Sequence, residues 1–326
     1  MKPAVKAQSR VQQIIAELSV ARDGSSIRDV RLGDAARRAS ASAHSEILGN
    51  QRAAGKLIEH IATEAGIETD KFDPILARNR IALQRVADER KAAAITNSTS
   101  VLKTFIDAID GRRRAFEHLT PAAAPPTFIA LDSPFLILPT TGNKLLDSSI
   151  APFRSFAKVT IASQLDDKEV GFYFLWENPS DRYAVINVDG YLVFNGLIGA
   201  TESGGFLPGN RFATMNVSGV LRTFEWWNQP PTEPLAQADQ SQLVRSITAD
   251  MGGGFGDVGD IESAHVFRGV DLSHTLFLVP PYGVTVIEVA AVLWSTTGTD
   301  GGDVSADFSS GDLQIMCPFV QIAVLT

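Results

Sequence analysis

Cysteine is almost missing from this chain, because Cys317 is the single one among 326 residues. A lone cysteine cannot build a disulfide framework or a cysteine-ligated zinc site. No stretch approaches the roughly 18 uninterrupted apolar residues of a membrane-spanning helix, so we expect no transmembrane span. The basic start is followed by no apolar segment of a secretion signal. We therefore expect synthesis in the cytoplasm, with release inside a particle or by lysis.

Sequence motifs of catalysis are missing too. The chain has no HExxH zinc motif, GxSxG nucleophile elbow or Walker phosphate loop, and its five histidines are scattered. The letters GxGxxG occur at Gly254, Gly256 and Gly259, without the strand and helix that a dinucleotide site requires. A net charge of −8 disfavours binding to nucleic acid. These absences predict a protein that is not an enzyme and has no cofactor other than a candidate calcium ion.

Proline and glycine are scarce before residue 120. Residues 1–120 hold 2 of the 16 prolines and 6 of the 26 glycines, and they carry a net charge of +5, against −13 for residues 121–326. Alanine-rich sequence favours helices, whereas aromatic and β-branched residues favour strands. We therefore predict an α+β protein of two parts. A helical stem at 1–119 is joined by a proline-rich linker at 120–127 to a β domain at 128–326.

Apolar residues of the first part recur at helical spacing. The stripes predict four helices, with breaks at Gly24, at Gly66 and in the polar cluster 97–99. Asp73 followed by Pro74 predicts the N-cap and first turn of one helix. Narrow, alanine-rich stripes favour a helical hairpin or bundle with coiled-coil-like packing, in which a buried asparagine fixes the oligomeric state. We expect the oligomer seam to consist of Leu76, Asn79, Leu83 and Val86.

The second part has the residue types of β-strands. Asp189-Gly190 lies between two short apolar runs and is typical of a type I′ turn, so a hairpin is expected there. About ten strands separated by turn residues predict an antiparallel β-sandwich or jelly roll. The predicted strands lie at 127–138, 155–163, 172–176, 183–188, 191–194, 211–225, 242–249, 264–272, 284–294, 304–309 and 313–325.

Two adjacent tryptophans end one predicted strand. Neighbouring strand residues face opposite sides of a sheet, so one indole should enter the core while the other faces outward. An exposed aromatic side chain beside amides is typical of a sugar-stacking or partner-binding surface. The alternative, which the usual burial of large aromatics favours, is that the following Pro-Pro loop covers both rings. The candidate ligand-binding residues are Trp226, Trp227 and Tyr282.

Two acidic, glycine-rich loops are candidates for calcium binding. Carboxylate and backbone oxygens are the ligands that Ca²⁺ prefers, although the spacing fits neither the EF-hand nor the nonapeptide calcium repeat. Ordinary solvated loops are the alternative. The candidate calcium ligands are Asp250, Asp257, Asp260, Asp300 and Asp303.

Three classes of function follow from this architecture. The first is a homo-oligomeric assembly protein, such as a particle or tail component, in which the helical stem carries a β-sandwich head for surface or partner recognition. Opposite charges on stem and head favour contact between copies. The second is a membrane-active protein, pore-forming or toxin-like, that uses amphipathic helices. The third is a carbohydrate-binding module. The expected partners are further copies of the chain and a surface receptor or carbohydrate.

Overall fold

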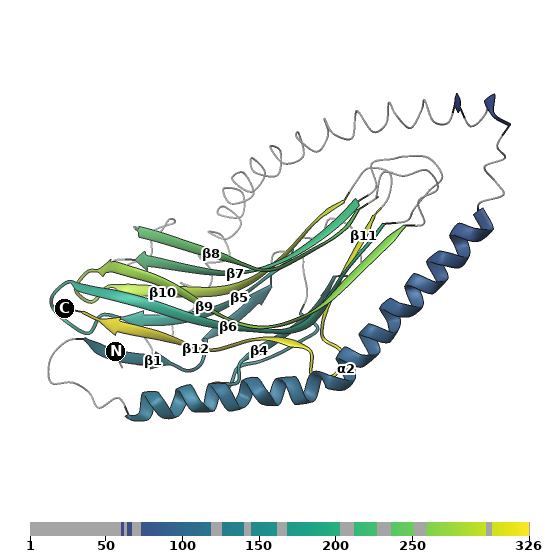
Figure 1. The fold of residues 1–326 in the computed structure, drawn as a ribbon. Helices are drawn as coiled ribbons and strands as arrows, with labels where there is room; N and C mark the ends of the chain where they lie inside the picture. The colour runs from purple at the N-terminus through teal and green to yellow at the C-terminus, as the bar shows by residue number, and fades with distance from the viewer. Residues whose placement is uncertain are drawn as a thin grey trace.

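Twelve strands and one long helix make up the part of the chain that the structure, a computed structural model, describes (Figure 1). The described residues are 60–61, 64–66, 73–118, 126–139, 145–161, 168–202, 212–226, 236–250, 259–297 and 302–325. The helix is α2 (Asp73–His118). The strands are β1 (Thr127–Leu131), β2 (Leu136–Pro139), β3 (Asp147–Ser149), β4 (Phe156–Ile161), β5 (Lys168–Glu177), β6 (Ala184–Glu202), β7 (Phe212–Trp226), β8 (Ala236–Asp250), β9 (Asp260–Val279), β10 (Val284–Thr297), β11 (Asp303–Phe308) and β12 (Gln314–Val324).

The strands form two antiparallel sheets that pack face to face. Sheet A has the order β1-β12-β4-β11-β6-β9, with β3 beside β4 and a direct β12–β6 pairing, and sheet B has the order β2-β5-β10-β7-β8. Alternate side chains of both sheets fill the space between them, and Phe172, Leu192 and Ile287 there are completely buried. The predicted antiparallel β-sandwich is confirmed.

Helix α2 lies along the outer face of sheet A (Figure 1). It begins at the predicted N-cap, Asp73, and at 1.5 Å per residue its 46 residues span about 69 Å. Buried Phe105 and Ile109 pack against an apolar cluster on the sheet that includes Tyr191 and Phe319. Contacts between the described residues of α2 and the sandwich run from Lys91 toward the C-terminal end. Residues 73–95 make up the N-terminal half of α2.

Charged side chains join α2 to the sheet as well. The Arg112 guanidinium donates two hydrogen bonds to the Asp271 carboxylate, at 2.7 and 3.3 Å, and lies 4.0 Å from the centre of the Tyr191 ring. The Asp271 carboxylate raises the pKa of Arg112 above its ordinary value. Arg154 donates to the Asp110 carboxylate at 3.0 Å. Helix α2, which belongs to the first predicted part, is therefore in direct contact with the β domain. The boundaries at 1–119, 120–127 and 128–326 stay predictions.

The predicted helix break at residues 97–99 is wrong, because α2 is continuous through them. Hydroxyl groups there bond to the preceding turn instead of ending the helix, as Ser98 Oγ donates to Ile95 O at 2.7 Å. Gly66, by contrast, has a φ of 66° and lies in a turn two residues after the helical Glu64, as a glycine that ends a helix does. The described residues therefore contain one long helix, while most of the segments expected to complete a helical hairpin or bundle lie outside them.

The predicted hairpin at Asp189-Gly190 is also wrong. These residues lie in the middle of β6, which runs unbroken from Ala184 to Glu202. A Cβ atom on Gly190 would lie 2.9 Å from Val289 Cγ2 in the facing sheet. Close approach of the two sheets is therefore the reason for this glycine, and no turn is needed.

Candidate functional site

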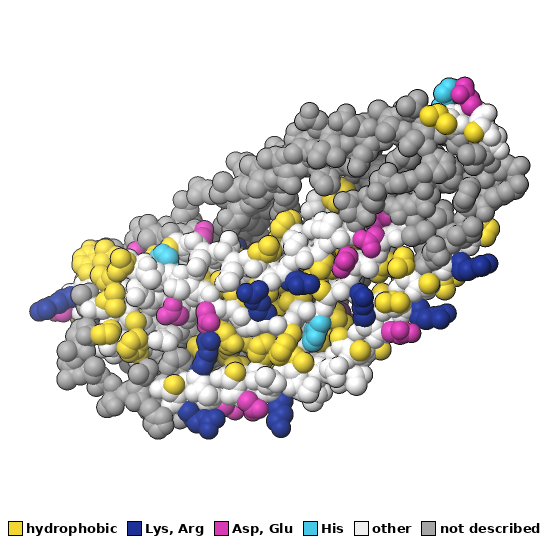
Figure 2. Space-filling model, in the orientation of Figure 1, with side chains coloured by type: hydrophobic (Ala, Val, Ile, Leu, Met, Phe, Trp, Pro, Cys, Tyr) yellow, Lys and Arg dark blue, Asp and Glu magenta, His cyan; other side chains and the backbone are white. Residues whose placement is uncertain are grey.

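One end of the sandwich, which we call the tip, is apolar and exposed. It is formed where β6 begins and where β9 turns into β10. Figure 2 shows hydrophobic side chains gathered at this end, on the left of the view. The exposed fraction is 70% for Leu276 and between 51% and 52% for the others. The four large side chains of the tip are Tyr183, Leu276, Leu278 and Tyr282.

The backbone of the tip is strained at two of these residues. Leu276 has a φ of 60° and Tyr282 a φ of 56°, in a region that bulky residues rarely adopt. Such conformations cost on the order of 1–3 kcal/mol each and persist where neighbouring groups hold them. Here Leu276 N donates to Asn187 Oδ1 at 2.9 Å, and Tyr282 N donates to Ser180 O at 3.2 Å. The strained backbone places two large apolar side chains in contact with solvent, which is typical of an interaction surface.

A buried asparagine joins the two loops of the tip. Asn178 Nδ2 donates to Arg182 O at 2.8 Å and to Pro280 O at 2.9 Å, while Asn178 Oδ1 accepts from Ser180 N at 3.1 Å. The side chain is 1% exposed. The loop that carries Tyr183 and the loop that carries Tyr282 are thus fixed relative to each other before any partner binds.

The structure brings part of the predicted ligand-binding set to the tip. Tyr282 belongs to it, and Trp226, the last residue of β7, pairs with Val284 in the backbone register. The side chain of Trp226 and all of Trp227 lie outside the described residues. Their burial and their part in binding stay predictions.

The acidic loops connect strand ends at the opposite end of the sandwich. Asp250 ends β8, Asp260 begins β9 beside Glu202, and Asp303 begins β11. The structure therefore brings the described ends of both loops together, while Asp257 and Asp300 lie outside the described residues. Within the described ranges, no group of three acidic, histidine or cysteine side chains is placed to hold a metal ion. Calcium binding stays a prediction.

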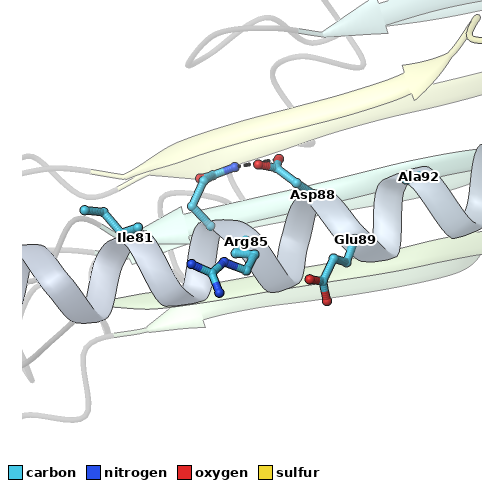
Figure 3. A pocket seen from close by; sticks show the side chains of 6 residues that line it. Ile81, Arg85, Asp88, Glu89 and Ala92 are labelled. Carbon is cyan, nitrogen blue, oxygen red and sulfur yellow. Dashed lines mark hydrogen bonds between the residues drawn. The ribbon is translucent and has the colours of Figure 1, made fainter.

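The N-terminal half of α2 carries a hollow of about 490 Å³ (Figure 3). Ile81 stands at one end of it with 65% of its surface exposed. Gln84 Nε2 donates to Asp88 Oδ1 at 3.0 Å along its wall. The described lining residues recur every three or four positions, so they share one side of the helix. They are Ile81, Gln84, Arg85, Asp88, Glu89 and Ala92.

The predicted oligomer seam lies elsewhere on the same half of α2. Leu83 is half-buried and lies on the same side of the helix as Ala94 and Phe105, which face the sheet. Val86, by contrast, is 45% exposed. The side chains of Leu76 and Asn79 lie outside the described residues. The seam therefore stays a prediction, and Leu83 belongs by position to the side of α2 that faces the sandwich.

A buried ionic network on the outer face of sheet B is a feature that sequence reasoning missed. Arg222 Nη1 donates to Glu288 Oε2 at 3.1 Å and also to the Glu169 carboxylate. Tyr173 Oη donates to Glu288 Oε1 at 2.6 Å. Glu288 is 3% exposed, and both carboxylates share the guanidinium of Arg222, so the network joins β5, β7 and β10 rather than forming an open reactive site.

Comparison with known proteins identifies no family. No family description and no curated protein matches the chain. Among solved structures, the carbohydrate-binding module TmCBM61 in complex with β-1,4-galactotriose has 9% identity and a TM-score of 0.17, covering 63% of this chain and 92% of its own. The mannan-recognising module TmCBM27 has 13% identity and a TM-score of 0.19, covering 61% and 99%. The enzymatically active domain of tailspike protein 4 from bacteriophage CBA120 has 11% identity and a TM-score of 0.18, covering 61% and 18%. Likenesses this weak do not identify a function.

None of the helices among the described residues is both long enough and apolar enough to cross a membrane.

Proposed function

We propose that this protein is a structural, self-assembling component whose copies associate head to tail. In this arrangement the tip of one copy is seated on the N-terminal half of α2 of the next copy. The observation that carries the proposal is the presence of two different apolar surfaces at opposite ends of one chain.

The two surfaces differ in shape and in position. The tip projects large side chains from a fixed backbone, and the hollow on α2 receives side chains beside Ile81 and Ala92. In Figure 1 the tip is at the left end of the molecule and the start of α2 is at the right end. Contact between unlike surfaces of identical chains is heterologous, and it builds rings or filaments rather than a closed twofold dimer.

Net charge favours approach of the helix and the sandwich at long range, although the described lining of the hollow itself has one basic and two acidic side chains. Residues 73–91 of α2 carry five basic and three acidic side chains, and residues 121–326 carry a net charge of −13. A basic helix of one copy and the acidic sandwich of the next attract each other at long range, which raises the rate of association. Tyrosine is also over-represented among residues that dominate binding energy at protein interfaces. The tip supplies the apolar anchors of the contact.

The test is the mass of the full chain in solution, measured by light scattering. The double substitution Leu276→Asn with Tyr282→Asn removes apolar surface, and asparagine tolerates positive φ better than leucine or tyrosine. Ile81→Asp puts a charge into the hollow at an exposed position. We expect each variant to lose the large assemblies of the wild-type chain while its circular dichroism spectrum stays unchanged. Higher salt should weaken wild-type assembly by screening.

Mixing the two blocked variants provides the decisive control. Each variant keeps one intact surface, so the mixture should form a complex of two chains and go no further. The substitution Val86→Asp tests the seam predicted from the sequence, because Val86 is exposed on the same half of α2. Loss of assembly in Val86→Asp alone, with the tip and Ile81 variants unaffected, would replace the head-to-tail contact by a helical seam. A wild-type chain that is monomeric at every concentration would refute self-assembly.

Carbohydrate binding is the second candidate function, because Tyr183 and Tyr282 expose aromatic rings on a rigid surface. It predicts that the tip variant loses binding to an oligosaccharide array while the mass in solution does not change. Head-to-tail assembly predicts the reverse.

A further inference from the structure

Three buried side-chain oxygen atoms just below the tip have no hydrogen-bond partner among the described residues. They lie on sheet B, and the atoms concerned are Thr223 Oγ1, Glu225 Oε1 and Thr285 Oγ1. Both threonines are 0% exposed and Glu225 is 7% exposed. Leaving such groups unpaired inside a protein is unfavourable, so a partner is expected.

Strand register places the three groups together on the inner face of sheet B. Thr285 pairs with Glu225 of β7, and Thr223 precedes Glu225 by two residues on the same side of that strand. Thr285 also pairs with Trp176 of β5, whose side chain belongs to the core between the sheets. The groups therefore point into the sandwich and away from solvent.

Sheet A presents a fourth unpartnered atom to the same region, His274 Nδ1. A Cβ atom on Gly190 of β6 would lie 3.5 Å from Leu221 Cδ1 of β7, so these two residues face each other across the core. Two residues nearer the tip than Gly190 and Leu221 lie Val188 on β6 and Thr223 on β7. Val188 pairs in the backbone register with His274 of β9. His274 thus lies at the level of Thr223 on the opposite side of the core.

We propose that Thr223, Glu225, Thr285 and His274 form an internal binding site for ordered water between the two sheets. Two hydroxyls, a carboxyl and an imidazole supply four partners, and a buried water forms about three hydrogen bonds. This site is separate from the head-to-tail surfaces and does not depend on them.

Electrostatics favours water over an ion at this place. Burial raises the pKa of Glu225, which favours the neutral carboxyl group. Burial lowers the pKa of His274, and the nearby charge of Asp239 opposes that shift. The walls around the four groups are apolar, with Ile287 and Phe277 among them. Water both donates and accepts hydrogen bonds, so it can serve a carboxyl, an imidazole and two hydroxyls alike.

A double-substitution cycle on the full chain tests the proposal. Thr223→Val and Thr285→Val remove the hydroxyls and keep the volume, and each should lower the Tm by about 2–4 °C if the hydroxyl binds water. The double variant should lose less than the sum, because the two hydroxyls act through shared water and not through a direct bond. A matched control is Thr214→Val, since Thr214 Oγ1 lies 3.0 Å from Thr248 Oγ1 at the surface. The decrease in Tm caused by Thr214→Val should add to the decrease caused by Thr285→Val.

Two results would overturn the water site. A Tm that is unchanged or higher in Thr285→Val would mean that the hydroxyl is unbonded and costs stability. Fully additive losses would mean that the hydroxyls share no ligand. Water–protein magnetisation transfer in NMR gives an independent readout, and long-lived water signals at the methyl groups of Thr223 and Thr285 are expected. Absence of these signals from the wild-type protein would also refute the site.

Discussion

Replacing Ile109 with alanine is expected to lower the free energy of unfolding by about 2–5 kcal/mol, because the side chain is fully buried where α2 meets sheet A. Its neighbours there, Tyr191 and Phe319, are large and stacked with ring centres 5.7 Å apart, so they cannot collapse into the space that is left. The loss also releases the helix from the sheet. Chemical denaturation of the full chain measures the first effect.

Limited proteolysis measures the second effect of Ile109→Ala. A helix that leaves the sheet exposes its flanks, so cleavage within α2 should become faster than in the wild-type chain. Lys103→Ala is the matched control, because Lys103 is exposed on the same helix and its loss should stay within about 0.5 kcal/mol. Equal stability of Ile109→Ala and Lys103→Ala would show that α2 is an independent stem that does not rest on the sandwich.

Sequence reasoning succeeded where the signal is local. Asp73-Pro74 predicts the start of α2 because an N-cap and a proline act within one turn. The run that begins at Val284 predicts β10 because every second side chain must fill the core. It failed at Gly190, where a distant partner decides the structure, and at Ser98, where the hydroxyl bonds to the preceding turn and the helix continues. Gly190 allows close contact with Val289 of the facing sheet. Ser98 O also accepts a hydrogen bond from Asn195 Nδ2 of β6 at 3.4 Å.

The candidate site was predictable only in part for the same reason. Tyr282 follows two prolines, so its exposure on a turn could be expected. In the sequence alone, nothing distinguishes Leu276 and Leu278 from the other residues of a long strand. A shift in register between β6 and β9 beside Ile186 and a positive φ turn Leu276 outward, and neither leaves a mark in the sequence. The hollow on α2 likewise depends on which side of the helix the sheet leaves uncovered.

Glu288→Ala is expected to cost about 3–5 kcal/mol of stability, since it removes one partner from a buried ionic network. Arg222 keeps Glu169, but it loses the more deeply buried of its two carboxylates. Tyr173 loses the acceptor of its hydroxyl, and that side chain is itself 1% exposed. The buried Tyr173 hydroxyl is then left without its acceptor, and Arg222 keeps one carboxylate instead of two.

Glu288→Gln separates the charge of this residue from its hydrogen bonds. The amide oxygen can accept from Arg222, and the amide nitrogen can donate to Tyr173 Oη, which acts as an acceptor after a rotation of its proton. Both bonds survive and only the negative charge is lost, while Arg222 remains paired with Glu169. We therefore expect glutamine to cost less than half as much as alanine. Equal costs for the two substitutions would show that the charge, and not the bonding pattern, stabilises the sheet.

Chemical denaturation of both variants decides between these contributions, with Glu262→Ala as the control for loss of an exposed glutamate from a strand. Glu262 lies on β9 at the surface, so its removal should change stability by no more than about 0.5 kcal/mol. A cost below about 1 kcal/mol for Glu288→Ala would contradict the burial of the network, because a solvated ion pair contributes only that much. Sheet B would then owe its stability to the apolar core alone, and its outer face would be open to solvent around Arg222.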